Sequence, residues 1–441
     1  MKSLAEQSVW YQATFETFEK SLNGEAGSEF HALRKKALAK FKELGFPTTR
    51  HEEWKFTNVT PIARTPFRPV PVGRSAKINE TNLRLPDLTE NRLVFVDGHY
   101  HASLSKIRRL PDKVIAGSLA EALKRHSAMV QKHLGKYVPF DEHPFVALNT
   151  AFARDGAFVW IPDGKGNDEP IHIHFIATGD ERDLISPRNL FIVGDRGRLS
   201  VIESYYAMRD GAYFTNAVTE LIVGEGATVE YDKLQDESLD GYHVSWTHSV
   251  QSSRSTVTSN LVALGGSIAR SNIHASLGGE GCECTLNGLS LGTRTQLIDN
   301  HTTIDHATPR CASHELYKAV LAGKSRGVFN GKIFVRKDAQ KTDAKQTNKT
   351  LLLSDDAVMD TKPQLEIFAD DVKCTHGATI GQLDADQVFY LRSRGLDLTS
   401  AQDMLTFAFA ADVVNRIHAK GLSERLEAMV HEKLHESRRG S

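Results

Sequence analysis

The sequence has few cysteines and no long hydrophobic run. The four cysteines, Cys282, Cys284, Cys311 and Cys374, are too few for a disulfide framework in a chain of 441 residues, so we expect reduced thiols. The N-terminal stretch lacks the apolar core of a signal peptide, and no window approaches the roughly 18 uncharged apolar residues of a membrane span. We therefore expect a cytoplasmic protein.

A large net charge of either sign is also lacking. The chain has 54 Lys and Arg residues against 55 Asp and Glu residues, which gives a formal net charge of −1. No overall field is available to attract nucleic acid or an anionic membrane surface. Neither of these partners is favoured.

At 441 residues the chain is too long for one ordinary compact core, and its patterning divides it into three parts. Helical spacing predicts two N-terminal helices, over 4–22 and 30–44, and a third from the capping box at Ser118 to about residue 135. Short runs of alternating apolar and polar residues, typical of strands, then replace the helical spacing. Helical spacing returns after Asp384. We predict an N-terminal helical or mixed domain (1–154), a β core (155–384) and a C-terminal helical domain (385–441).

A parallel β solenoid explains the middle part better than a sandwich, because no sandwich normally needs so many short strands without a break. In a stacked coil, like residues lie about 4.8 Å apart, and polar side chains can form hydrogen-bonded ladders along the stack. The polar segment "DAQKTDAKQTNKTLLLSDDA" (338–357) suits such a ladder better than a solvated loop. We therefore predict a mainly β, solenoid fold.

The tripeptide Gly323-Lys324-Ser325 resembles the end of a phosphate-binding loop. That motif needs a glycine five residues before Gly323, and Lys318 stands there. Any ATP chemistry must therefore come from another chain.

Two short pairs invite a metal-site interpretation. His172 and His174 lie on the same side of a predicted strand, as ligands in metal-binding barrels often do, but no carboxylate has a fitting spacing. A free-standing His-ligated metalloenzyme is therefore kept as the alternative hypothesis. Cys282 and Cys284 also share one side of a strand, yet a closed zinc site needs four ligands, so buried small hydrophobes are favoured.

The stretch "KCTHGA" places Cys374 and His376 on one face of the last predicted strand. There the final coil of a solenoid must be covered by something else. Thiolate and imidazole are both good ligands for iron or zinc, and two ligands are too few alone, which indicates a second chain. The residues alone still favour the plainer interpretation, a core thiol beside a surface imidazole.

Residues 314–395, from "HELYKAVLAGKSRG" to "FYLRSRG", closely resemble the SufB/SufD family of iron–sulfur cluster assembly proteins. The segment "GFPTTRHEEWKFTN" (45–58) resembles the N-terminal segment of the family. Within the family the chain resembles the SufD branch, since SufB proteins typically have Glu-His-Glu where this sequence has Thr375-His376-Gly377.

The resemblance implies a right-handed parallel β-helix (solenoid) between helical end domains, in a scaffold subunit without catalytic activity of its own. It implies pairing with SufB through the β-helix ends, and sulfur supplied indirectly by a cysteine desulfurase system. His376, and in second place Cys374, would serve cluster assembly together with the partner chain. It also implies a transient iron–sulfur cluster at the SufB interface, reduced flavin in the complex, and no cofactor held stably by the isolated chain, which could form a homodimer.

The resemblance further implies that the ABC-type ATPase SufC docks on the C-terminal helices. The apolar face of these helices is wide for a solitary tail, so part of it should pack internally and part should face a partner. The residues that we predict for this docking are Leu405, Phe409, Leu426, Met429 and Val430.

Overall fold

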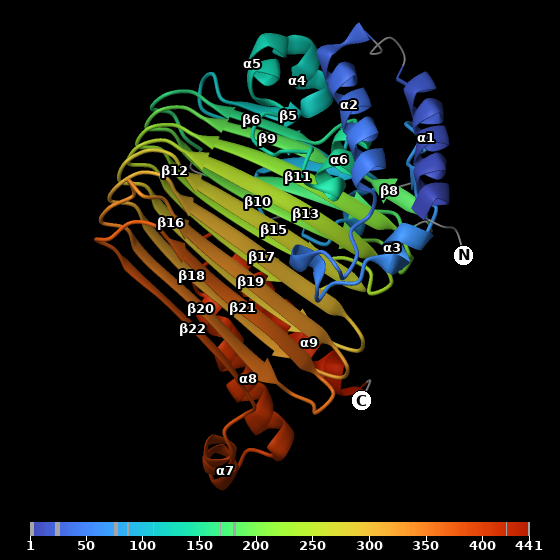
Figure 1. Cartoon of the computed structure of the whole chain (residues 1–441). Helices are drawn as coiled ribbons and strands as arrows, with labels where there is room; N and C mark the ends of the chain where they lie inside the picture. The colour runs from blue at the N-terminus through green and yellow to red at the C-terminus, as the bar shows by residue number, and fades with distance from the viewer. Residues whose placement is uncertain are drawn as a thin grey trace.

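Two sheets of mainly parallel strands form the body of the molecule, and helices flank it at both ends of the chain (Figure 1). The computed structural model describes residues 4–22, 27–74, 78–85, 88–108, 110–167, 169–179, 182–419 and 421–439. From β9 (Arg188–Val193) onwards successive strands alternate between the sheets, so the coils stack as a solenoid. The predicted fold class, a mainly β solenoid between helical segments, is confirmed.

The first sheet, sheet A, runs in the order β21-β19-β17-β15-β13-β11-β9-β6-β5. Its strands are β5 (Ile115–Ser118), β6 (Ala157–Ile161), β9 (Arg188–Val193), β11 (Phe214–Val223), β13 (Tyr242–Gln251), β15 (Ile268–Leu277), β17 (Leu297–His306), β19 (Arg326–Val335) and β21 (Val358–Ile367). The short strands β1 (Arg68–Pro69) and β8 (Asp183–Ile185) attach to it beside β11.

The second sheet, sheet B, runs in the order β22-β20-β18-β16-β14-β12-β10-β7-β2-β3. Its strands are β2 (Asn91–Val96), β3 (His99–Tyr100), β7 (Ile171–Ala177), β10 (Arg198–Ala207), β12 (Thr228–Asp236), β14 (Thr256–Ala263), β16 (Glu283–Gly292), β18 (Ala312–Leu321), β20 (Asp343–Leu352) and β22 (Lys373–Gly381), with β4 (Lys106–Ile107) paired to β2.

Strand pairing stays in register from coil to coil, so side chains form columns across the stack. In β20 the side chains of Gln346 and Asn348 are buried. Gln346 Nε2 donates to Glu315 Oε2 of the preceding coil (2.7 Å), and Asn348 Nδ2 donates to the Tyr317 carbonyl (3.2 Å). These bonds are of the kind that the predicted polar ladder requires.

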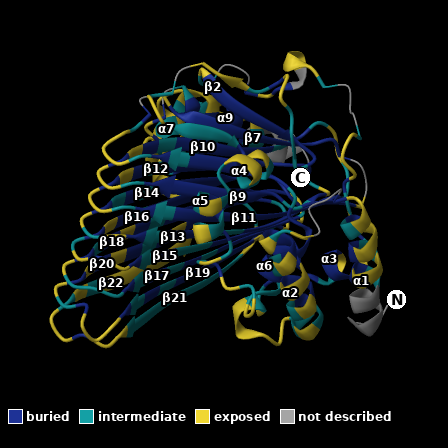
Figure 2. Ribbon diagram, turned by 90° about the horizontal axis from the view of Figure 1, so that it is seen from above, coloured by how far each residue is buried: buried dark blue, intermediate teal, exposed yellow. Residues whose placement is uncertain are grey.

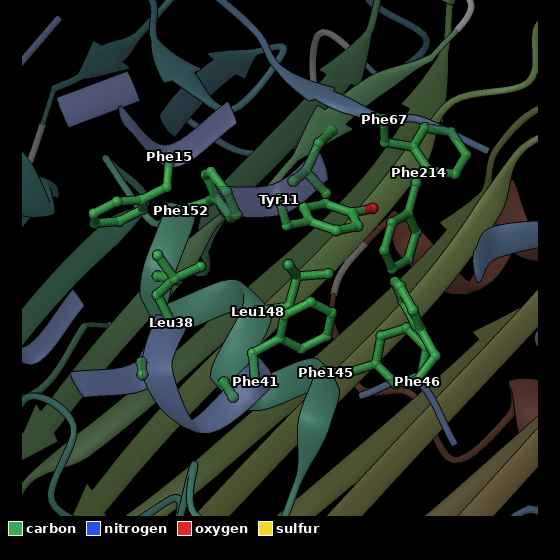
Figure 3. Close-up of a cluster of buried hydrophobic side chains, with 14 of the residues drawn as sticks. Tyr11, Phe15, Leu38, Phe41, Phe46, Phe67, Phe145, Leu148, Phe152 and Phe214 are labelled. Carbon is green, nitrogen blue, oxygen red and sulfur yellow. The ribbon is translucent and has the colours of Figure 1, made fainter. Parts of the chain in front are cut away.

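The N-terminal helices pack on the outer face of sheet A. They are α1 (Leu4–Lys20), α2 (Glu29–Leu44), α3 (Thr60–Arg64) and α6 (Pro144–Phe152), with a short 3-10 helix at Glu52–Trp54. A buried aromatic cluster joins them to β11, where Phe145 of α6 contacts Phe214 edge-on at 5.8 Å (Figure 3). The two helices predicted at the start of the chain are confirmed, and α2 begins at a Ser28 cap, whose side chain accepts from the His31 amide.

The single helix predicted from Ser118 to about residue 135 is wrong. The cap is present, because the Ser118 hydroxyl accepts from the Glu121 amide. However, His126 leaves the helical conformation (φ −129°, ψ 35°) and separates α4 (Leu119–Arg125) from α5 (Ser127–His133). His126 and Ser127 both have only moderate helix propensity, so the local sequence does not enforce continuation.

The C-terminal helices are α7 (Ala385–Ser393), α8 (Leu398–Val414) and α9 (Leu422–Arg439). Apolar residues of α8 and α9, such as Val413 and Val430, pack against the outer face of sheet B, where Val320 and Leu289 belong to the same buried cluster. In Figure 1, α7 projects beyond the last strands. None of the helices in the described part of the chain is long and apolar enough to cross a membrane.

Candidate functional site

Burial decreases towards the last coil of the solenoid (Figure 2). Strands β21 and β22 are the terminal strands of their sheets, so each is paired on one side only within the described residues. An unpaired strand edge presents free backbone donors and acceptors to another chain. Four exposed apolar side chains lie on or beside these strands, and together they define the edge patch: Val358, Ile367, Phe368 and Ile380.

Cys374 and His376 lie on β22 at this open end. In the register with β20, Cys374 stands opposite Ala344 and His376 opposite Gln346, and both of these β20 residues are buried. The pair therefore continues two interior columns of the solenoid. Cys374 is half-buried against an apolar cluster that includes Ile333, whereas His376 is exposed. The structure thus brings the predicted pair together on one face.

A polar column lies beneath His376. Glu315 on β18, Gln346 on β20 and His376 on β22 are successive members of it. The Glu315 carboxyl is buried, which raises its pKa to about 7. The other carboxyl oxygen of Glu315 (Oε1) and the amide oxygen of Gln346 have no hydrogen-bond partner among the described residues. A carboxyl that titrates near neutral pH therefore lies two coils below the exposed imidazole.

The Cys374 thiol is not activated by its surroundings. Partial burial, followed by the nearby Asp343 charge, raises its pKa above the ordinary value for a thiol. A thiol that keeps its proton is a poor nucleophile and a poor metal ligand. Within the described residues no group of three His, Cys, Asp or Glu side chains is placed to hold a metal ion. At the open end, the described residues bring together two potential ligands, Cys374 and His376.

The other candidate metal residues belong to the core. His172 and His174 are buried in β7, and both rings hydrogen-bond the Ser204 hydroxyl at 2.7 Å. Burial lowers the pKa of His174 to about 3, so its ring is neutral. Cys282 and Cys284 are also buried, as the interpretation as small hydrophobes requires. These surroundings give the alternative metalloenzyme hypothesis no support.

Three of the five residues predicted for docking lie in the core of this chain. Leu426, Met429 and Val430 of α9 are buried against sheet B. Leu405 and Phe409 of α8 are half-buried.

The exposed apolar side chains of the C-terminal helices are different ones, and together they define the helical patch: Phe389, Tyr390, Leu398 and Met404. Helical spacing identifies an apolar face but not which body covers it, so the sequence pattern did not single these residues out. Docking itself stays a prediction.

The sequence pattern placed Gln346 in a polar ladder but did not connect it with His376, and it did not single out Glu315. Gln346 lies one coil after Glu315, and His376 lies one coil after Gln346. The number of residues per coil, had it been known, would have placed these residues in one column with His376.

Comparison with known proteins gives two family matches that together span most of the chain. The model described as "SUF system FeS cluster assembly, SufBD core domain" matches residues 175–409, and the model described as "SufBD protein N-terminal region" matches residues 5–173.

Individual relatives match along most of their length. An iron–sulfur cluster assembly SufBD family protein of Synechocystis sp. is 34% identical over 398 residues, which cover 88% of this chain and 87% of that protein. Iron–sulfur cluster assembly protein SufD of Escherichia coli is 30% identical over 400 residues, covering 90% and 91%. The Bacillus subtilis protein of the same name is 26% identical over 413 residues, covering 91% and 93%.

Proposed function

The chain belongs to the SufBD family of iron–sulfur cluster assembly proteins, and on that premise we propose that it is the non-catalytic scaffold subunit of a cytoplasmic SufBCD complex. In this proposal it pairs with SufB through β21 and β22, and the two chains together form the site at which a cluster is built. The ATPase SufC docks on the C-terminal helices, and a cysteine desulfurase system supplies the sulfur.

One observation supports the proposal above all. The open end of the solenoid combines an unpaired strand edge, an apolar edge patch and the incomplete pair Cys374 and His376. In this proposal the His376 imidazole holds iron–sulfur cargo together with thiolate ligands from the partner chain, and a site shared by two chains releases that cargo when the chains move apart. ATP-driven association of SufC subunits would supply the energy for such a movement.

Several parts of the proposal concern what the chain binds. The cluster is transient cargo at the SufB interface, and the isolated chain holds no cofactor stably. Reduced flavin is bound in the complex. In the absence of SufB, the same unpaired edge allows a homodimer.

The test is cluster formation by the complex reconstituted with SufB and SufC, followed by visible absorption. His376→Ala should impair cluster formation without loss of complex or fold, because an exposed imidazole contributes about 1 kcal/mol or less to stability. Cys374→Ser should leave assembly largely working, since the thiol keeps its proton.

The matched control is His314→Ala, which removes an exposed imidazole from β18. Assembly by this variant should equal that of the wild type. Wild-type yield from His376→Ala, or a loss confined to Cys374→Ser, would reverse the roles proposed for the pair.

A further inference from the structure

Two of the four cysteines lie one above the other in neighbouring coils. Cys282 comes directly before β16, and Cys311 comes directly before β18. The first residues of these two strands, Glu283 and Ala312, are register partners, and the Ala312 amide donates to the Cys282 carbonyl (2.9 Å). The register therefore extends to the two cysteines. Neighbouring strands lie about 4.8 Å apart, which is within the range of Cα separations that a disulfide spans.

The side chains of the two cysteines also meet. Cys282 Sγ lies 3.0 Å from the carbonyl oxygen of Gly279, and Cys311 Sγ lies 3.4 Å from the same oxygen. Both side chains are buried in one apolar cluster. A hydrogen bond between the two thiols raises the pKa of Cys282 and lowers that of Cys311, and a bond with the His306 ring also lowers the latter. The pair therefore favours a thiolate at Cys311 beside a protonated thiol at Cys282.

The other two cysteines have no such neighbour. Cys284 lies two residues further along, in β16, and its register partners on β14 and β18 are not cysteines. Cys374 stands opposite an alanine of β20. Within the described residues, Cys282 and Cys311 are therefore the only two cysteines aligned in adjacent coils.

The pair lies just beneath two exposed turns. Glu280 and Arg310 precede the cysteines in these turns, are exposed, and form an ion pair across the coils. An exposed ion pair contributes little to stability. Local opening of the turns, without unfolding of a strand, therefore exposes the sulfur atoms to a small uncharged oxidant such as hydrogen peroxide.

We propose that Cys282 and Cys311 are a redox-sensitive dithiol, which hydrogen peroxide converts into an intrachain disulfide between neighbouring coils. The Cys311 thiolate attacks one peroxide oxygen and becomes a sulfenic acid. The O–O bond breaks, and the other oxygen leaves as hydroxide and takes up a proton to become water. The Cys282 sulfur then attacks the sulfenic sulfur, so the S–S bond forms, the S–O bond breaks and a second water leaves. The two thiols lose two protons and two electrons in all, and one hydrogen peroxide is reduced to two waters.

The disulfide has a consequence for the whole solenoid. It joins two coils covalently and so limits the freedom of the unfolded chain, and the oxidised protein is therefore more resistant to heat. A thiol reductant reverses the bond by exchange. None of these residues belongs to the assembly site proposed above, so the switch is independent of that proposal.

The test uses the full-length chain, which is treated with hydrogen peroxide, alkylated and digested without reductant. Mass spectrometry should find one linked peptide pair, Cys282 to Cys311, and the intact chain should lose about 2 Da. Dithiothreitol should abolish both signals. The midpoint of thermal unfolding should rise by about 2–5 °C on oxidation and return to its first value on reduction.

Two variants locate the bond, and a third is the matched control. Cys311→Ala and Cys282→Ala should each abolish the linked peptide and the rise in the unfolding midpoint. Cys284→Ala, which removes a buried thiol from the same cluster, should keep both. If the first two variants do not fold, the linked peptide of the wild-type chain decides the question by itself.

Three results would overturn the proposal. The first is a folded, peroxide-treated chain in which these two thiols stay free or only gain oxygen. The second is a disulfide that involves Cys284 or Cys374 in place of the proposed pair, or that joins two chains, as a non-reducing gel would show. The third is a linked pair that leaves the unfolding midpoint unchanged.

Discussion

Burial separates histidines that hold this fold together from the one at its open end. His172 and His376 each lie in a strand with a second potential ligand two residues away. The sequence pattern therefore does not distinguish the pair His172 and His174 from the pair Cys374 and His376. In the structure, His172 is enclosed and bonded to Ser204, whereas His376 is exposed above a polar column. Residue type and spacing therefore do not distinguish the two pairs, whereas solvent exposure does.

The buried Glu315 carboxyl predicts a pH-dependent stability. Its pKa is raised from 4.5 to about 7 in the folded chain, so the native state keeps a proton that the unfolded chain has lost, and stability falls as the pH rises through this range. Glu315→Gln removes the buried charge. The difference in the free energy of unfolding between this variant and the wild type should therefore change with pH. It should shift in favour of the variant by up to about 3 kcal/mol between about pH 5 and about pH 8, as measured by urea unfolding.

The control for this prediction is Glu283→Gln, which changes an exposed carboxyl on β16. Its stability difference from the wild type should be the same at both pH values. A difference for Glu315→Gln that does not vary with pH would mean that the carboxyl keeps its ordinary pKa in the fold.

At the scale of elements, the sequence predicted features that depend on local patterns, such as the bounds of a helix and the face of a strand on which a side chain lies. Helical spacing placed the second helix at 30–44, and the structure has Glu29–Leu44. The change from helical to alternating patterning at about residue 155 indicated a solenoid but missed β2 to β5, which lie before it and belong to the same sheets. The two-residue spacing put Cys374 and His376 on one face.

Contacts between coils could not be predicted in the same way. Glu315 lies below Gln346 only because β18 and β20 pair in one particular register, and register depends on the whole stack. For the same reason the sequence pattern could not show that Met429 faces sheet B. The missing information is which elements become neighbours, which no local period contains.

Close stacking of the coils predicts an effect at Gly279, in the turn before β16. A Cβ atom at Gly279 would lie 2.0 Å from the backbone nitrogen of Ser253 in the neighbouring coil. Because backbone cannot rotate away as a side chain can, Gly279→Ala should lower the free energy of unfolding by at least about 1–3 kcal/mol. Chemical denaturation measures this change.

Gly377 on β22 is the matched control, since a Cβ atom there meets nothing within 4 Å. Gly377→Ala should change stability by no more than about 0.5 kcal/mol. Equal losses in the two variants would indicate that substitution of glycine matters through backbone freedom, and not through contact between coils.

At the scale of the whole molecule, the two ends of the solenoid differ. The first coils are joined by β2 to β5 and lie beside the N-terminal helices, whereas β21 and β22 end their sheets with an exposed apolar border (Figure 1). The helical patch on α7 and α8 is a second exposed apolar surface. Exposed apolar patches of this kind mark protein interfaces, so the molecule has two surfaces for the two partners proposed.

One substitution in each patch should separate the two partners. Phe389 is 73% exposed and Phe368 is 60% exposed, so Phe389→Asp and Phe368→Asp should each change stability by no more than about 0.5 kcal/mol. A carboxylate placed in an apolar contact loses hydration without gaining a partner. Phe389→Asp should therefore abolish co-purification of SufC and keep SufB, and Phe368→Asp should do the reverse. Loss of both partners with either folded variant, or loss of neither with both, would place the docking surfaces elsewhere.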